Sequence, residues 1–153
     1  MNLCDIHGFT PLHVACINGN IDIVNILLKC NGSVNLCDIH GFTPLHVACI
    51  NGNIDIVNIL LKCNSSVNLC NTDGYTPLHV ACRNGNIDIV NSLLKFNSSV
   101  NLCDTDGFTP LHAACINGHT DVVHILLDNN CDINSNNNIF IYNVACQKGY
   151  QDI

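Results

Sequence analysis

The chain has 153 residues, a length typical of a single domain, and 48% of them are apolar while 11% are charged. This balance excludes a disordered chain, because it provides enough apolar side chains for a packed core. Five basic against 12 acidic residues give a net charge of −7, which excludes a nucleic-acid interface and a basic membrane-binding patch.

Targeting segments are the next feature to consider. Apolar runs stay well short of the roughly 18 residues of a transmembrane helix. Residues 1–10 lack the basic and apolar stretches of a secretory signal peptide. We therefore expect a protein of the cytoplasm, or of the nucleus, that makes no membrane contact through this segment.

A long motif recurs along the chain at a fixed spacing of 33 residues. It reads D-I-H-G-F-T-P-L-H-V-A-C in residues 5–16 and 38–49, N-T-D-G-Y-T-P-L-H-V-A-C in residues 71–82, and D-T-D-G-F-T-P-L-H-A-A-C in residues 104–115. Residues 2–31 are identical to residues 35–64. Such a period predicts a solenoid, in which stacked units bury one continuous core.

The period and the T-P-L-H-x-A core resemble the ankyrin repeat family. The resemblance covers one domain over residues 1–153, with repeats at about residues 5–37, 38–70, 71–103 and 104–134 and a partial, degenerate repeat at residues 135–153. It implies an all-α repeat solenoid of stacked helix-turn-helix units with β-hairpin fingers.

Each repeat predicts a short first helix. In repeat one, Thr10 can cap the helix and Pro11 suits its first position, where no backbone N–H is needed. Leu12 and Cys16 then lie on one apolar face. Gly19 ends the helix, because glycine adopts a positive φ freely.

A second helix follows in each repeat. Asn20 can cap it, and an apolar stripe contains Ile21, Val24 and the Leu27–Leu28 pair. Asn31 then stands where the family usually has glycine, and asparagine tolerates the same left-handed backbone. Residues 35–43 resemble the family's finger, with Gly41 in its turn.

The two ends of the array lack the polar caps usual for solenoids. Repeat one is identical to repeat two, so its outer apolar stripe should face water. Residues 135–153 have drifted from the repeat pattern. We therefore expect a fragment of a longer array.

Recurring cysteines and histidines could suggest a metal site, because His13-x-x-Cys16 returns in the next three repeats. Each repeat offers only two ligands, however, and the family resemblance implies a structural, hydrogen-bonding histidine. The cysteines of the first helix, such as Cys16, suit small buried core positions, while those of the fingers should be exposed. We expect no bound metal, no cofactor and no disulfide ladder.

The sequence contains no recognisable catalytic motif. The sequence has no nucleophile elbow, phosphate loop or separate carboxylate pair, so we expect no enzyme activity. The resemblance adds one candidate modification, hydroxylation of a finger asparagine. Only Asn134 retains the upstream leucine and aspartate that this modification prefers in the family.

The resemblance implies that the chain binds another protein through the concave face of fingers and first helices. An aromatic residue recurs there every 33 residues, either as a contact surface or as packing between fingers. The implied partner-binding residues are Phe9, Ile39, His40, Phe42, Ile50, Asn51, Thr72, Asp73, Tyr75, Arg83, Asn84, Thr105, Asp106 and Phe108.

The side chains at the finger tips change along the array, from isoleucine and histidine in the first two repeats to threonine and aspartate in the next two. A scaffold or adaptor is the function that these features favour. The alternative is a targeting arm of a larger protein, such as a kinase, an acyltransferase, a ubiquitin-ligase adaptor or an ion channel.

Overall fold

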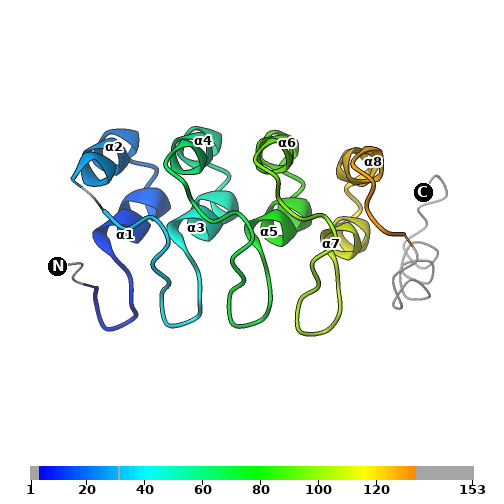
Figure 1. Ribbon diagram of the computed structural model, residues 1–153, viewed down its shortest axis with the longest axis horizontal. Coiled ribbons are helices and arrows are strands. Elements are labelled where there is room, and N and C mark those ends of the chain that lie inside the picture. Colours follow the sequence, from blue (N-terminus) through cyan, green and yellow to red (C-terminus); the bar gives the residue numbers. More distant parts are fainter. Residues whose placement is uncertain (1–3, 31, 134–153) are drawn as a thin grey trace.

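The computed structural model describes residues 4–30 and 32–133, which form a row of helix pairs (Figure 1). No strand occurs in these residues. The helices are α1 (Pro11–Ile17), α2 (Ile21–Lys29), α3 (Pro44–Ile50), α4 (Ile54–Lys62), α5 (Pro77–Asn84), α6 (Ile87–Lys95), α7 (Pro110–Asn117) and α8 (Thr120–Asp128).

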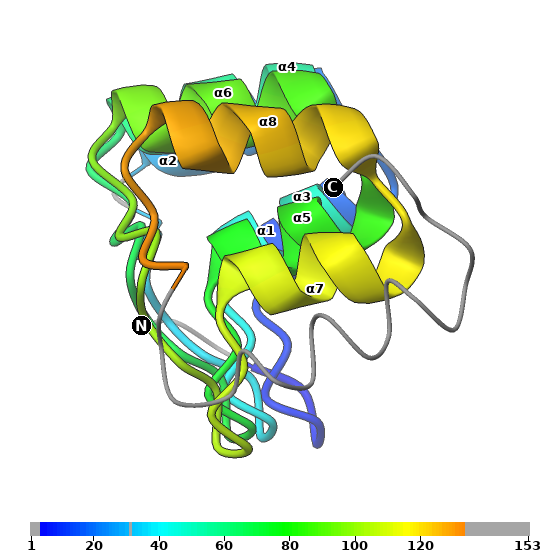
Figure 2. The same cartoon turned by 90° about the vertical axis from the view of Figure 1, so that its right-hand side faces the viewer.

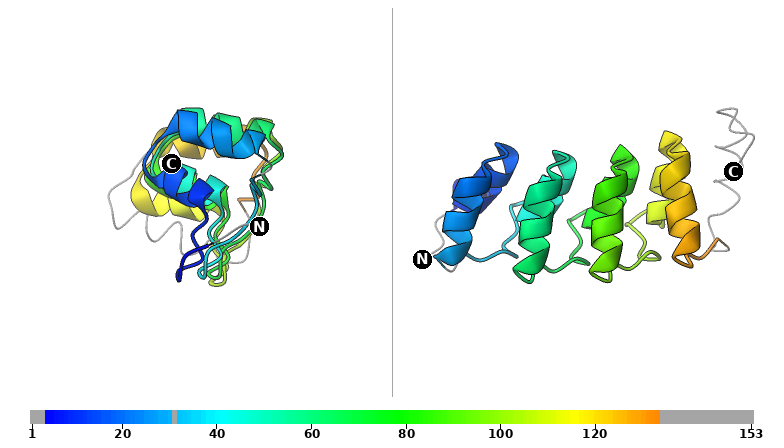
Figure 3. Two further views of the ribbon diagram at one scale, coloured as in Figure 1. Left: turned by 90° about the vertical axis from the view of Figure 1, so that its left-hand side faces the viewer. Right: turned by 90° about the horizontal axis from the view of Figure 1, so that it is seen from above.

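The helices form two layers. Figure 2 shows α1, α3, α5 and α7 in one layer, α2, α4, α6 and α8 in the other, and the fingers projecting from the first layer. Figure 3 shows the same regular stacking from above, where each pair lies beside the next. Every helix contacts its counterpart in the neighbouring pair as well as its own partner. The predicted all-α repeat solenoid is therefore confirmed.

The first helix of each pair begins as the sequence predicts. In α3, the Thr43 Oγ1 accepts a hydrogen bond of 3.3 Å from the His46 N–H, and the Thr43 N–H donates to the His46 Nδ1 at 3.2 Å. Pro44 occupies the first helical position. This reciprocal capping box recurs at α1, α5 and α7 and satisfies backbone donors that a helix start leaves free.

The second helices begin differently, and the predicted cap at Asn20 is wrong. Asn20 occupies the N-cap position, but its side chain makes no capping hydrogen bond, and the same holds for Asn53 and Asn86. Instead, the Asn53 Nδ2 donates to the Cys16 carbonyl oxygen of the preceding repeat at 3.3 Å. The amide therefore links two repeats, which a pattern within one repeat does not reveal.

Left-handed residues end the helices where they were expected. Gly19 has a φ of +69° after α1. Asparagine replaces glycine after the second helices, with φ values of +62° at Asn64, +63° at Asn97 and +58° at Asn130. The predicted left-handed Asn31 lies outside the described residues.

The fingers follow a hairpin path without forming regular strands. In the second finger, the Asp38 N–H donates to the Phe42 carbonyl oxygen at 3.0 Å, and the Gly41 N–H donates to the Asp38 carbonyl oxygen at 3.0 Å. Gly41 has a φ of +81°, and an added Cβ would lie 2.8 Å from the Cα of Asn71 in the next finger. Only glycine satisfies both conditions.

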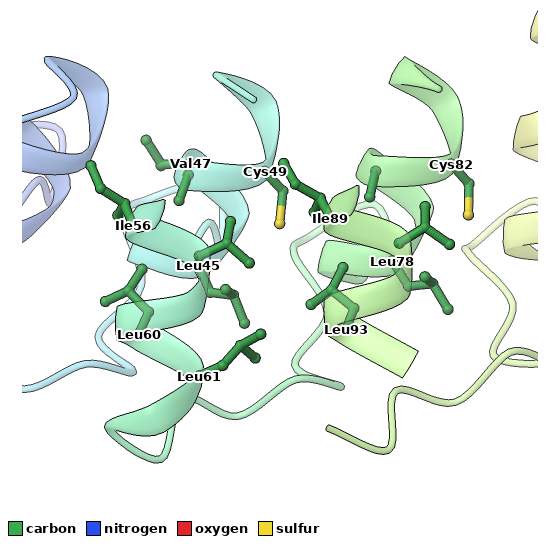
Figure 4. Close-up of a cluster of buried hydrophobic side chains, with 14 of the residues drawn as sticks. Leu45, Val47, Cys49, Ile56, Leu60, Leu61, Leu78, Cys82, Ile89 and Leu93 are labelled. Atoms are coloured by element: carbon green, nitrogen blue, oxygen red, sulfur yellow. The ribbon is translucent and has the colours of Figure 1, made fainter. Parts of the chain in front are cut away.

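The core runs between the layers and repeats itself from pair to pair. Figure 4 shows Leu45, Leu60 and Ile56 in the second repeat, with Leu78, Leu93 and Ile89 in the same places of the third. All six are almost fully buried.

The predicted stripe on the second helix is only partly correct. Val24 is fully buried, but Ile21 is 39% exposed, because it is the first residue of α2 and lies at the margin of the interface. In the second and third repeats, the position two residues further along the second helix is buried instead, as Ile56 and Ile89.

Candidate functional site

A buried histidine on each first helix links its repeat to the next finger. The His46 Nδ1 accepts a hydrogen bond from the Thr43 N–H, and its Nε2 lies 2.9 Å from the Tyr75 carbonyl oxygen. A backbone N–H only donates and a carbonyl only accepts, so His46 is neutral and carries its proton on Nε2. Burial lowers the pKa of His46 to about 4.

The same contact recurs along the stack. His13 donates through Nε2 to the Phe42 carbonyl oxygen at 2.9 Å, and His79 donates to that of Phe108 at 3.1 Å. Burial lowers the pKa of both imidazoles, although the carbonyl bond opposes this effect. The expectation of structural histidines is therefore confirmed, and these bonds hold the backbone of Phe42, Tyr75 and Phe108 against the preceding repeat.

Neighbouring fingers are also joined directly. The Thr72 N–H and Oγ1–H both donate to the His40 carbonyl oxygen, at 2.9 and 3.0 Å. Thr105 makes the same two contacts with the Asp73 carbonyl oxygen, both at 3.0 Å. The finger tips therefore form one continuous edge rather than four independent loops.

The sequence-predicted contact residues fall into two groups. Those on the finger tips and at the ends of the first helices are exposed, namely Ile39, His40, Ile50, Asn51, Thr72, Asp73, Arg83, Asn84, Thr105 and Asp106. The four aromatic residues, Phe9, Phe42, Tyr75 and Phe108, are half-buried.

The half-buried rings contact the histidine of their own repeat. The ring centroids lie 5.8 Å apart for Phe9 and His13, and 5.3 Å apart for Phe108 and His112. Each ring therefore packs on the first helix of its own repeat, whereas the sequence-based alternative was packing between fingers. The rest of its surface stays accessible, so packing and partner contact are compatible.

A hollow of about 290 Å³ opens on this face between the third and fourth repeats. Tyr75 and Phe108 line it from the two fingers, Arg83 from the end of α5, and Asn117 from the end of α7. Ala113 also lines it, where the other three repeats have a valine. This hollow is not predicted by the repeat motif, although the change from valine to alanine at residue 113 is visible in the sequence.

The hollow contains charges of both signs. Asp104 lines it, but its Oδ1 accepts hydrogen bonds from the N–H groups of Asp106 and Phe108 at 2.9 and 2.8 Å, so the carboxylate holds the finger turn. Burial raises the pKa of Tyr75, the Asp104 charge raises it further, and the nearby Arg83 charge lowers it. Arg83 is the one arginine or lysine among the described residues that line the hollow, and His79 lines it as well.

Comparison with known families agrees with this geometry. The family model for ankyrin repeats (3 copies) matches residues 1–70 and, in a second match, residues 60–137. The chain belongs to the ankyrin repeat family. A comparison with curated proteins finds no match.

Ankyrin repeats are, in general, non-catalytic protein–protein interaction modules, and they bind other proteins. In this ankyrin array, the described helices have 7–9 residues, and none is long and apolar enough to cross a membrane. No group of three or more His, Cys or Asp side chains in residues 4–30 and 32–133 is arranged to hold a metal ion.

Two sets of cysteines recur along the ankyrin array, one on the first helices and one in the fingers. Those of the first helices are buried, and burial raises the pKa of the Cys16 thiol to about 12. The finger cysteines Cys37, Cys70 and Cys103 are exposed. All 11 cysteines among the described residues are free thiols, and both placements agree with the sequence-based expectation.

The candidate hydroxylation site, Asn134, lies outside the described residues. Its counterpart one repeat earlier, Asn101, shows what this position does in the fold: the Asn101 Oδ1 accepts a hydrogen bond of 2.8 Å from the Asp132 N–H. Asn35 and Asn68 make the same bond to Ser66 and Ser99. The modification of Asn134 stays a prediction.

Proposed function

We propose that this ankyrin array is a scaffold or adaptor whose concave face binds a peptide segment of another protein, and that it acts without chemistry of its own. The observation that carries the proposal is the hollow between the third and fourth repeats, which two aromatic rings and Arg83 line on the face formed by the fingers and first helices. Aromatic and arginine side chains are the residues that most often anchor protein interfaces.

The charge pattern indicates the chemistry of the segment. Asp104 keeps its charge, but its Oδ1 holds its own finger turn, so Arg83 is the cationic group in the hollow that can pair with an acidic side chain of a partner. A guanidinium favours a carboxylate, because its planar N–H groups match the two carboxylate oxygens. The segment therefore carries an acidic side chain that enters the hollow beside Arg83.

The apolar half of the face accepts a different part of the segment. Ile39 on the second finger is 58% exposed and Ile50 at the end of α3 is 47% exposed, whereas Thr72 and Asp73 occupy the third finger tip. We infer that apolar side chains of the partner lie over the first two repeats. A cytoplasmic location fits the free thiols, because free cysteines persist in reducing compartments.

Peptide display tests this proposal without a known partner. The probe is a library of random linear peptides selected against the purified chain and, in parallel, against Arg83→Ile. Isoleucine is the residue at this position in the second and fourth repeats, so the fold accommodates the substitution. Lys95→Ile is the matched control, because it removes the same charge from the end of α6.

We expect a selected motif with an aspartate or glutamate at a fixed position from the wild-type chain and from Lys95→Ile. Selection against Arg83→Ile should lose that acidic position. A second variant, with Phe42, Tyr75 and Phe108 changed to Glu, should lose the motif altogether. Recovery of an unchanged motif from either variant, with a native circular dichroism spectrum, would contradict the concave-face proposal.

A further inference from the structure

The turn between α7 and α8 carries a histidine where the preceding repeats have asparagine (Figure 2). His119 stands directly before α8, as Asn53 and Asn86 stand before α4 and α6. The Asn53 Nδ2 donates to the carbonyl oxygen of Cys16, whereas the His119 Nε2 donates to that of Arg83 at 3.0 Å. In terms of repeat positions, the imidazole therefore reaches one residue further along the preceding first helix.

The imidazole also lies directly on the turn of the third repeat. A Cβ added to Gly85 would lie 2.5 Å from the His119 Nδ1, whereas a Cβ added to Gly52 would lie 3.5 Å from the Asn86 Nδ2. His119 therefore packs more closely on the third repeat than Asn86 packs on the second. Together with the hydrogen bond, this packing fixes the end of α5, where Arg83 lines the hollow.

The carbonyl oxygen that His119 occupies has a different partner one repeat earlier. Ile50 is the counterpart of Arg83, and its carbonyl oxygen accepts a hydrogen bond of 3.3 Å from the Asn84 Nδ2. The Asn84 side chain therefore crosses from the third repeat to the end of α3. His119 already satisfies the Arg83 carbonyl oxygen, so the same crossing between the third and fourth repeats would gain little.

Asn117, the counterpart of Asn84, does not cross but folds back on its own helix. Its Nδ2 donates to the Ala113 carbonyl oxygen at 2.8 Å. Asn51 does the same in the second repeat, with the Val47 carbonyl oxygen at 3.1 Å. An asparagine at this position therefore has two arrangements, and only the crossed one uses a carbonyl oxygen of the preceding repeat.

We propose that His119 determines the specificity of the concave face, because it keeps Asn117 folded back and so keeps the hollow beside Arg83 open to an acidic side chain of the partner. Arg83 and Asn117 line the hollow from its two sides, so an amide that crossed to the Arg83 carbonyl oxygen would join the two walls. His119 is not one of the described residues that line the hollow, so it acts by positioning those that do. The identity of the entering side chain rests on the proposed function, whereas the opening of the hollow does not.

The test replaces His119 by the residue of the preceding repeats. His119→Asn should free the Arg83 carbonyl oxygen for Asn117, and the fold accommodates asparagine at this position, as at Asn53. His124→Asn is the matched control, because His124 is exposed on α8 and the preceding repeats have asparagine there too. A third chain combines His119→Asn with Asn117→Ala, which removes the amide that could cross.

The first measurement needs no partner. Ala113 lines the hollow and its side chain is a single methyl group, so the exposure of this methyl reports whether the hollow is open. Relaxation enhancement of the methyl NMR signal by a dissolved neutral nitroxide measures that exposure. We expect the enhancement to fall severalfold in His119→Asn, to keep its wild-type value in His124→Asn, and to recover in the chain that also carries Asn117→Ala.

The second measurement is selection from the same library of random linear peptides. The share of selected peptides with the fixed acidic residue should fall about tenfold for His119→Asn, which is the effect of losing one hydrogen bond to a charged group. The wild-type chain, His124→Asn and the combined variant should all retain the acidic position.

Unchanged methyl exposure in His119→Asn would overturn the proposal, and so would an equal loss of exposure in His124→Asn. A loss that Asn117→Ala does not reverse would also overturn it, because Asn117 would then not be the group that closes the hollow. If the wild-type chain itself selects no acidic position, the proposed function fails, while the methyl measurement still decides whether His119 holds the hollow open.

Discussion

Acid should destabilise this repeat stack through its buried histidines, and His46 determines the size of the effect. Its side chain is fully buried, and burial lowers its pKa to about 4 from an ordinary value of 6.5. In the fold, its Nδ1 accepts the Thr43 N–H and its Nε2 donates to the Tyr75 carbonyl oxygen. A second proton on the ring would leave two N–H groups facing each other at Nδ1.

The sign and the magnitude follow from linkage. Between pH 6.5 and about pH 4, the unfolded chain binds a proton at His46 that the folded chain does not bind, so the free energy of unfolding falls as the pH falls. A pKa difference of roughly 2.5 corresponds to about 3 kcal/mol once the transition is complete. His13 and His79 act in the same direction, because burial lowers their pKa values as well.

Urea unfolding followed by circular dichroism, in small steps from about pH 7.5 to about pH 4.5, measures this dependence. The wild-type chain should keep its full stability above about pH 6.5 and lose it progressively below. His46→Gln should be less stable at neutral pH but should lose less on acidification, because the titrating group is gone. His40→Gln is the control, since His40 is exposed at a finger tip and should leave the slope unchanged.

The result that refutes this reasoning is specific. If the wild-type chain and His46→Gln lose the same free energy of unfolding over this pH range, His46 does not titrate between the two states. The lowered pKa of the buried imidazole would then be wrong. Equal slopes in His46→Gln and His40→Gln would have the same meaning.

Two further predictions test the finger turns and the thiols. Gly41→Ala should lower the unfolding free energy by about 2 kcal/mol or more, because the added Cβ would lie 2.8 Å from the Asn71 Cα. Gly52→Ala is the comparison, because Gly52 has a similar φ of +70° but its nearest contact is 3.5 Å away. Thermal melts should show a loss of only about 1 kcal/mol for Gly52→Ala. Comparable losses in the two variants would contradict the close approach of adjacent fingers. Brief treatment with N-ethylmaleimide, analysed by peptide mass spectrometry, tests the thiols. Cys70 should react in the folded chain, whereas Cys49 should react only on unfolding, because Cys49 is buried and burial raises its pKa. Labelling of both cysteines at the same rate would show that the first-helix thiols are open to solvent.

Much of the candidate site was predictable from single repeats. The exposed finger-tip positions follow from the motif, because Asp73 and Thr105 stand beside a glycine turn whose backbone bonds are local. The hollow was not predicted, since it depends on how the small side chain of Ala113 faces the finger of the preceding repeat. The double role of Tyr75, whose carbonyl oxygen holds His46 while its ring borders the hollow, likewise needs two repeats.

The sequence by itself determined the period, the helix starts at Thr43 and its equivalents, and the left-handed residues such as Asn64, because these features depend on contacts within a few residues. Only the tertiary structure decided that Asn53 bridges repeats instead of capping its helix. It also decided that Ile23 is open while Ile56 is buried, although both stand in identical sequence. Local propensity is a property of the chain segment, whereas burial is a property of its neighbours.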